Sequence, residues 1–320
     1  MFDEYSAEWL RNLADGGCAV CQRPPKSRHR QMQLSRLAVP EHLSYHLFKS
    51  EATMNKQRKG PNRRGIEWTD YTWNPTGGCL HGCTWKMPDG SVAVCYAKKI
   101  AEGLAHHAYP QGFEYHYWRP HALSEPLKLK ESAKIFVGSM ADLFGHWVPE
   151  EHIRQVLDVM RQAHWHTFQT LSKYPVRLPS FNPYPSNVWV GVSLPAGHQM
   201  SADGGARALR AYLGQMDVVR ASVRFLSAEP LWFDAGHVLE TWAEKNGGLP
   251  FEWVILGAAT NGPKTYQPRA EWIERMLAVL DDYSVPVFFK GNLHWMPRRE
   301  HFPASHNELA ECDQRLVIQR

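Results

Sequence analysis

Short apolar runs alternate with longer amphipathic stretches along most of the chain, from Ile66 onward. The runs are nearly continuously apolar, as strands buried on both faces are, and six of them predict β-strands over 134–140, 166–172, 187–194, 223–229, 252–259 and 285–291. Between them, segments such as 150–163 and 269–283 carry apolar residues at every third or fourth position, which is typical of an amphipathic helix. The alternation predicts an α/β protein built from β/α units.

The number of β/α units narrows the choice among α/β folds. Six or seven β/α units in one chain favour a partial (β/α) barrel of the TIM type over an open doubly wound sheet, and such a fold carries its chemistry at the carboxyl ends of the strands. The 320 residues, 43% of them hydrophobic, suffice for one large core. We therefore expect a basic N-terminal extension over 1–65, the barrel over 66–300 and a C-terminal tail over 301–320.

Positive charge is concentrated in the predicted extension. The net charge of the chain is only +4, yet between Arg23 and Arg64 basic residues greatly outnumber acidic ones. These groups could follow the phosphates of a nucleic acid while an aromatic residue such as Tyr45 or Phe48 stacks on a base. A solvated, partly disordered extension explains the same charge, so both interpretations stand.

No apolar run is long enough to span a bilayer, and the N-terminus lacks the basic and apolar regions of a signal peptide. We expect a soluble cytoplasmic protein. In that compartment, grouped cysteines indicate metal ligation more than disulfides. The groups here are a pair, Cys18 and Cys21, and a triplet, Cys79, Cys83 and Cys95, besides the single Cys312.

The triplet has the spacing C-x3-C-x11-C and is followed at once by Tyr96 and a helical pattern. Three thiolates can hold three irons of a [4Fe–4S] cluster and leave the fourth iron open to a ligand. Glycines at 77, 78 and 82 allow the backbone to wrap closely around such a group. The alternative is zinc, held by the three cysteines with His81 as the fourth ligand, in a nucleic-acid-binding protein without turnover.

Eight motifs together resemble one known family, in the order WNPTGGC, CYAKKIA, FVGSMADLFGHWVP, HTFQTLSKYPVRL, NVWVGVSL, RFLSAEPL, EWVILGA and VPVFFKG. They are similar to the phage-associated three-Cys-motif family of unknown function, which is itself similar to radical S-adenosylmethionine proteins of the spore photoproduct lyase type. The resemblance covers roughly residues 66 to 295 and implies a phage- or prophage-encoded protein in a bacterial host.

The same resemblance implies cofactors, partners and a reaction class. It implies a [4Fe–4S] cluster, S-adenosylmethionine and a 5′-deoxyadenosyl radical, with modification or repair of nucleic acid or a nucleotide as the expected activity. An electron-donor protein such as flavodoxin or ferredoxin would reduce the cluster. The superfamily spacing is C-x3-C-x2-C, so residues 84–94 are an insertion here; because MPDGS is typical of a β-turn, we expect a small hairpin that returns Cys95 to its two fellows.

S-adenosylmethionine is implied to lie across the strand ends, at positions that correspond to Ser139, Met140, Asp142, Ser193 and Glu229. A buried Glu229 needs a cation or several hydrogen-bond donors, and a ligand ammonium or Lys173 would serve as the cation. The alternative is a structural ion pair with an arginine of a neighbouring strand.

Three residues are candidates for catalysis, namely Lys173, Glu229 and Lys290. Lys173 and Lys290 each close an apolar strand and could hold a phosphate or a carboxylate, although both could equally extend along the surface into water.

Cys18 and Cys21 form a C-x2-C knuckle between glycine and proline. Such knuckles commonly give two ligands to zinc, and His29 or Cys312 could complete the set. An auxiliary iron–sulfur cluster and two free thiols are the other interpretations, so this pair is a candidate second metal site only.

Overall fold

The computed structural model describes residues 53–57, 65–195 and 200–304. The chain divides into two units, residues 1–51 and 52–320, and all described residues belong to the second. The predictions for Cys18, Cys21, His29 and Cys312 fall outside the described residues, as does most of the basic segment.

One eight-stranded sheet organises the described unit, with strand order β1-β2-β7-β8-β9-β10-β11-β14. Neighbouring strands from β2 to β14 are parallel, and β1 is antiparallel to β2. Their bounds are β1 Met54–Lys56, β2 Tyr71–Trp73, β7 Lys134–Val137, β8 Thr167–Ser172, β9 Val188–Ser193, β10 Val223–Ala228, β11 Trp253–Leu256 and β14 Val287–Phe289. Because the edge strands β1 and β14 are not paired with each other among the described residues, the barrel is partial, as the sequence predicts.

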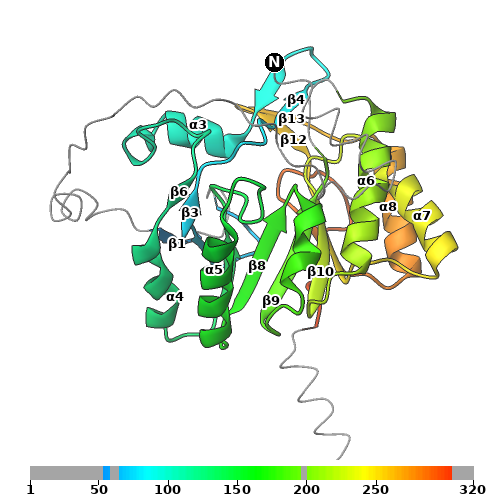
Figure 1. Cartoon of the computed structure of the whole chain (residues 1–320). Helices are drawn as coiled ribbons and strands as arrows, with labels where there is room; N and C mark the ends of the chain where they lie inside the picture. The colour runs from blue at the N-terminus through cyan, green and yellow to red at the C-terminus, as the bar shows by residue number, and fades with distance from the viewer. Residues whose placement is uncertain (1–52, 58–64, 196–199, 305–320) are drawn as a thin grey trace, which may run out of the picture. The chain divides into compact units, whose positions relative to one another are not determined.

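Helices connect the parallel strands (Figure 1). The α-helices are α3 Tyr96–Glu102, α4 Glu125–Lys128, α5 Glu150–Gln162, α6 Ala202–Asp217, α7 Ala235–Asn246 and α8 Ala270–Asp282, and the 3₁₀-helices are η1 His106–Ala108, η2 Pro120–Ser124 and η3 Pro175–Phe181. The apolar positions that predict α5 and α8 are buried, for example Ile153 and Ile273. None of the helices in the described part of the chain is both long and apolar enough to cross a bilayer.

All six predicted strands are present in the eight-stranded sheet, and the other two strands of that sheet, β1 and β2, are not foreseen by the sequence. β2 and β1 each have only three residues, too few to produce a recognisable apolar run. β1 lies within residues 1–65, so the sheet begins inside the range that the sequence assigns to the extension.

Aromatic residues fill one side of the sheet. Trp253 lies at the centre of this cluster, with its ring 5.6 Å from that of Trp189 and 5.3 Å from that of Phe225. Gly191 makes the packing possible, because a Cβ there would lie 2.4 Å from the Phe225 ring. The interior is thus occupied by side chains, as in other barrels of this kind, which leaves the strand ends for chemistry.

Three small two-stranded sheets accompany the main sheet. β3 Thr76–Gly77 pairs with β6 Tyr117–Trp118, β4 Thr84–Lys86 pairs with β5 Val92–Val94, and β12 Ala259–Asn261 pairs with β13 Lys264–Tyr266. Figure 1 shows β4, β12 and β13 together at one end of the sheet. β12 follows the carboxyl end of β11 closely, so this is the end where a (β/α) fold places its site.

Candidate functional site

The cysteine loop begins with a close backbone approach. The Gly78 amide donates to the carbonyl oxygen of Met140 at 3.0 Å, and the Cys79 amide donates to that of Phe113 at 2.9 Å. Gly78 has φ of +78°, and a Cβ on it would lie 1.8 Å from the Tyr115 carbonyl oxygen. Only glycine fits this position, which joins the loop to the segment after β7.

The inserted residues between the second and third cysteines form the hairpin that the sequence predicts. β4 and β5 pair with Thr84 opposite Val94, and the Gly90 amide closes the turn on the Met87 carbonyl at 2.9 Å. At the open end, the Cys95 amide donates to the Cys83 carbonyl at 3.1 Å. The detour therefore returns Cys95 to a position beside Cys83, immediately before α3.

The three thiols are free and partly shielded from water: Cys83 is 9% exposed, and Cys79 and Cys95 are half-buried. Burial raises the pKa of Cys79, and the Asp142 carboxylate adds to the effect. Burial also raises the pKa of Cys83, against the opposing effect of the Lys173 ammonium. A metal would have to displace the thiol protons, so its binding would release protons.

Among the described residues, no three His, Cys, Asp or Glu side chains are gathered around a point where one metal ion would sit. The single-zinc interpretation of the triplet requires four ligands on one ion. An iron–sulfur cube makes a different demand, because each thiolate binds its own iron and the sulfurs surround the cube. Three free thiols on one folded loop fit that donor set.

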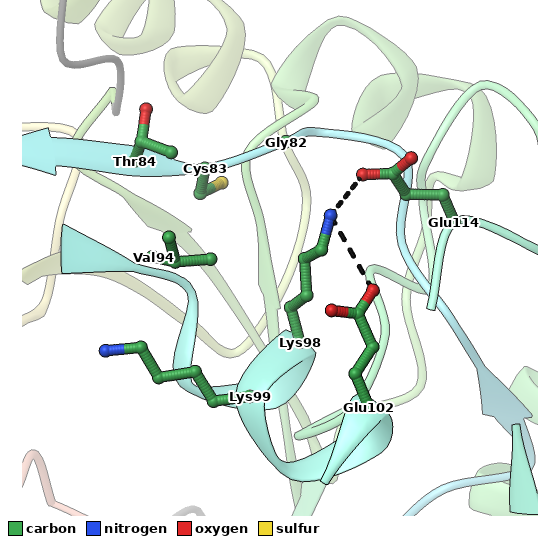
Figure 2. Close-up of a pocket in the computed structure, with 8 residues that line it drawn as sticks. All are labelled: Gly82, Cys83, Thr84, Val94, Lys98, Lys99, Glu102 and Glu114. Atoms are coloured by element: carbon green, nitrogen blue, oxygen red, sulfur yellow. Dashed lines mark hydrogen bonds and ion pairs between the residues drawn. The ribbon is translucent and has the colours of Figure 1, made fainter. Parts of the chain in front are cut away.

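Cys83 also lines a pocket of about 390 Å³ on the flank of the loop. Figure 2 shows Lys98 of α3 extending between Glu114 and Glu102, with Cys83 and Val94 on the neighbouring wall. The Lys98 ammonium lies 2.7 Å from the Glu114 carboxylate and 3.7 Å from that of Glu102. The sequence does not single out this ion-paired group.

Asp142, which is 4% exposed, fixes the loop to the sheet. Its Oδ2 lies 2.7 Å from Nε2 of His81 and accepts hydrogen bonds from the Ser172 hydroxyl at 3.0 Å and the Lys173 amide at 2.8 Å. Its Oδ1 accepts from the Phe144 amide at 3.0 Å. Burial alone would raise the pKa of Asp142, but the hydrogen bond and charge of His81, with the other donors, outweigh burial and lower the pKa.

A ligand would therefore meet an Asp142 carboxylate that is already bonded to several donors. The pairing also occupies one ring nitrogen of His81, the predicted alternative zinc ligand. The sequence gives no sign of this contact, because the two residues are far apart along the chain.

Ser139 and Met140 lie where the chain leaves β7, and Asn74 holds both. The Asn74 amide nitrogen donates to the Ser139 hydroxyl at 3.1 Å, and its oxygen accepts from the Met140 amide at 2.9 Å. Tyr96, the residue after the third cysteine, donates its hydroxyl to the Ser139 carbonyl at 2.6 Å. The sequence does not point to Asn74, because this residue follows β2, a strand too short to be recognised.

Lys173 is half-buried, and its ammonium interacts electrostatically with the cysteine thiols. Burial would lower the pKa of Lys173, but attraction to Cys83, Cys95, Asp142 and Cys79 outweighs burial and raises the pKa. No carboxylate of the described residues lies within ion-pairing distance of the ammonium. The Lys173 ammonium thus interacts electrostatically with the thiols and has no fixed anionic partner among the described residues.

Glu229 has a different partner from those expected. Its Oε1 lies 2.6 Å from the Lys290 ammonium, and among the described residues it forms no ion pair with Lys173 or with an arginine. The two side chains are 28% and 19% exposed, which also excludes a Lys290 that extends freely into water. Gly257 leaves space for the pair, since a Cβ there would lie 2.8 Å from Cγ of Glu229. Ser193 is buried at the end of β9 between the two halves of the site.

Taken together, the fold and these residues define a mostly parallel α/β protein with a cysteine loop at the carboxyl ends of its strands. The chain belongs to the DUF5131 family, described as proteins of unknown function, whose model matches residues 63–316. No curated protein sequence matches it significantly.

Solved structures of spore photoproduct lyase are similar to the chain. The lyase complexed with dinucleoside spore photoproduct has 10% identity and a TM-score of 0.43, covering 69% of this chain and 76% of that one. A double mutant of the lyase with bound AdoMet and the same dinucleoside has 11% identity, a TM-score of 0.43 and the same coverage. A cysteine-to-alanine mutant with the dinucleoside has 11% identity and a TM-score of 0.45, covering 73% of this chain and 80% of that one. These likenesses concern the fold alone.

Proposed function

We propose that the protein is a radical S-adenosylmethionine enzyme whose [4Fe–4S] cluster is held by Cys79, Cys83 and Cys95. The observation that carries the proposal is the return of Cys95 to Cys83 through the β4–β5 hairpin. Without that hairpin, a C-x11-C spacing would leave the third thiol without a fixed place. With it, three free thiols belong to one loop at the reactive end of a (β/α) fold.

The charge of Lys173 suits such a group. A cube bound to three thiolates would bring negative charge into a partly buried place, and the Lys173 ammonium, which has no carboxylate partner among the described residues, would offset it. Asp142 and His81 would keep the loop on the strand ends while the cluster is loaded and reduced. When bound and reduced, such a cluster would supply the one electron that cleaves S-adenosylmethionine to methionine and a 5′-deoxyadenosyl radical.

S-adenosylmethionine would lie across the strand ends. Ser139 and Met140 follow β7, Ser193 ends β9 and Glu229 follows β10, so these residues form one row along the edge of the sheet. The Glu229–Lys290 pair gives that row a carboxylate and an ammonium 2.6 Å apart. Such a pair can orient a polar ligand by offering it a donor and an acceptor together.

A nucleic acid or a nucleotide is the proposed substrate, and an electron-donor protein such as flavodoxin or ferredoxin is the proposed reductant. The support for the substrate is the basic segment between Arg23 and Arg64 and the resemblance of the eight motifs. The alternative is a zinc-stabilised, non-catalytic nucleic-acid-binding protein, and the test below distinguishes it from the radical enzyme.

Anaerobic reconstitution with iron and sulfide tests the proposal. The wild type should take up about four irons per chain, absorb broadly in the visible range and cleave S-adenosylmethionine when reduced. Cys83→Ala should lose both colour and cleavage, whereas Asp158→Ala, on the exposed face of α5, should keep both. A colourless wild type with stoichiometric zinc would favour the alternative, and cleavage retained in Cys83→Ala would contradict the ligand assignment.

A further inference from the structure

The turn of the β4–β5 hairpin contacts the β12–β13 hairpin, which comes from a distant part of the chain. Asp89, in the turn between β4 and β5, accepts from the Lys264 ammonium at 2.9 Å and from the Tyr266 hydroxyl at 2.6 Å, both on β13. Its other oxygen accepts from the amide and the hydroxyl of Ser91, at 3.1 and 2.6 Å. One carboxylate thus receives four hydrogen bonds, and its donors, led by Ser91, lower the pKa of Asp89.

Asn261 of β12 makes a second connection. Its amide nitrogen donates to the Ser91 hydroxyl at 3.3 Å, and its amide oxygen accepts from the Lys99 ammonium of α3 at 3.2 Å. The two sides of the third cysteine are therefore both attached to the β12–β13 hairpin. β5 leads into Cys95 and α3 leads out of it.

The β4–β5 hairpin depends on this attachment for its stability. β4 and β5 have three residues each, and an isolated two-stranded hairpin of that size is marginal in water. Exposed ion pairs contribute little one by one, but several contacts that share one carboxylate form a network with a defined geometry. The position of Cys95 relative to Cys83 depends on the hairpin and hence on what holds its tip.

We propose that Asp89 is a positioning residue for Cys95: by joining the β4–β5 turn to β13, it keeps the third thiol beside the second. This inference rests on the proposed function for the identity of the group that the thiols receive. The β12–β13 hairpin thereby gains a role, because it connects the cysteine loop to β11 on the far half of the sheet.

Hydrogen exchange in the metal-free full-length protein tests the anchor directly. The Cys95 amide, which is bonded to the Cys83 carbonyl, should exchange roughly three to five times faster in Asp89→Ala and in Lys264→Ala, the range expected for loss of exposed charge-assisted contacts. The double variant should exchange no faster than Asp89→Ala alone, because the Lys264 contact is one of those that Asp89→Ala already removes. The charge-swapped variant Asp89→Lys/Lys264→Asp should restore slow exchange only in part, because it returns the ion pair but not the bonds from Ser91 and Tyr266. Asp158→Ala should leave the exchange unchanged.

Cluster retention after reconstitution tests the consequence. Asp89→Ala should lose iron to a chelator several times faster than the wild type, and its reduced cluster should give a broadened electron paramagnetic resonance signal. If the wild type holds iron, and Asp89→Ala retains it equally well and exchanges the Cys95 amide equally slowly, the inference is wrong. The proposed function would be unaffected by that result. A wild type without iron would contradict the proposed function, and the exchange measurement alone would then decide whether Asp89 positions Cys95.

Discussion

Nε2 of His81 lies 2.7 Å from Oδ2 of Asp142, and this contact joins the cysteine loop to the end of β7. Because the same oxygen also receives the Ser172 hydroxyl and the Lys173 amide, one buried carboxylate connects the loop to two strands. The relative placement of the thiols and the strand ends thus depends on a residue that is not itself a thiol.

Removing this carboxylate should destabilise the fold. Asp142→Ala leaves the donors around it without an acceptor, and we expect it to lower the free energy of unfolding by about 2–4 kcal/mol. Asp142→Asn keeps the shape but loses the charge, so it should be affected less. Urea denaturation measures both. Asp158→Ala is the control, and an Asp142→Ala protein as stable as the control would show that water replaces the carboxylate.

Gly78 and Gly90 form a matched pair of positions with positive φ. A Cβ on Gly78 would collide with the Tyr115 carbonyl, whereas one on Gly90 would meet nothing within 4 Å. Gly90→Ala should therefore cost about 1 kcal/mol from backbone strain alone, and Gly78→Ala distinctly more, with impaired iron uptake. Thermal unfolding and iron analysis compare the two. Similar losses in both variants would mean that the close approach at Gly78 is easily relieved.

The Glu229–Lys290 pair should behave as a coupled unit. Glu229→Gln or Lys290→Met leaves the other charge partly buried and unpaired, which we expect to cost about 1–2 kcal/mol after allowance for the exposure of both side chains. The double variant should be less destabilised than the sum of the single ones. A double-mutant cycle in urea measures the coupling, and strict additivity would argue that water already screens the pair.

His116 should make the fold sensitive to acid. Nε2 of His116 lies 3.2 Å from Nδ1 of His152, and burial, followed by the charge of His152, lowers the pKa of His116 to about 4. The unfolded chain, with an ordinary histidine, binds the proton first as the pH falls, so this stabilisation is present above about pH 6.5 and is lost toward pH 4.

Urea midpoints between pH 7.5 and 4.5 measure this effect, which we expect to reach about 1–2 kcal/mol for a half-buried ring. His116→Phe keeps an aromatic ring against His152 and removes the titration, so its stability should fall less over the same range. Parallel pH profiles for the variant and the wild type would assign the acid sensitivity to other groups.

Binding of single-stranded DNA should depend steeply on salt. Each phosphate neutralised by a basic residue contributes about −0.7 to the slope of log affinity against log salt concentration. Replacing Arg58, Lys59, Arg63 and Arg64 by glutamine should weaken binding and flatten that slope. Fluorescence anisotropy at several salt concentrations measures it. Binding that is absent, or independent of salt, would remove nucleic acid as a partner of this segment.

The amino-acid sequence determined the elements whose signal is local. Long apolar runs predicted six strands of the parallel sheet because a strand buried on both faces must be apolar throughout. The MPDGS turn predicted the hairpin between Cys83 and Cys95 because the flanking strands are joined across a few residues. The cysteine spacing predicts Cys79, Cys83 and Cys95 as the donors of the candidate site, and all three are free thiols in the structure.

Only the tertiary structure decided which distant side chains meet. The pairing of Glu229 with Lys290, of Asp142 with His81 and of Asp89 with Lys264 joins residues on separate elements, and a polar residue after a strand is compatible with many partners. For the same reason, the sequence does not predict β1 and β2. A segment of three residues forms a strand only when a neighbouring strand offers a complete row of hydrogen bonds. Periodicity reports burial along one element, whereas charge pairing depends on the packing of all of them.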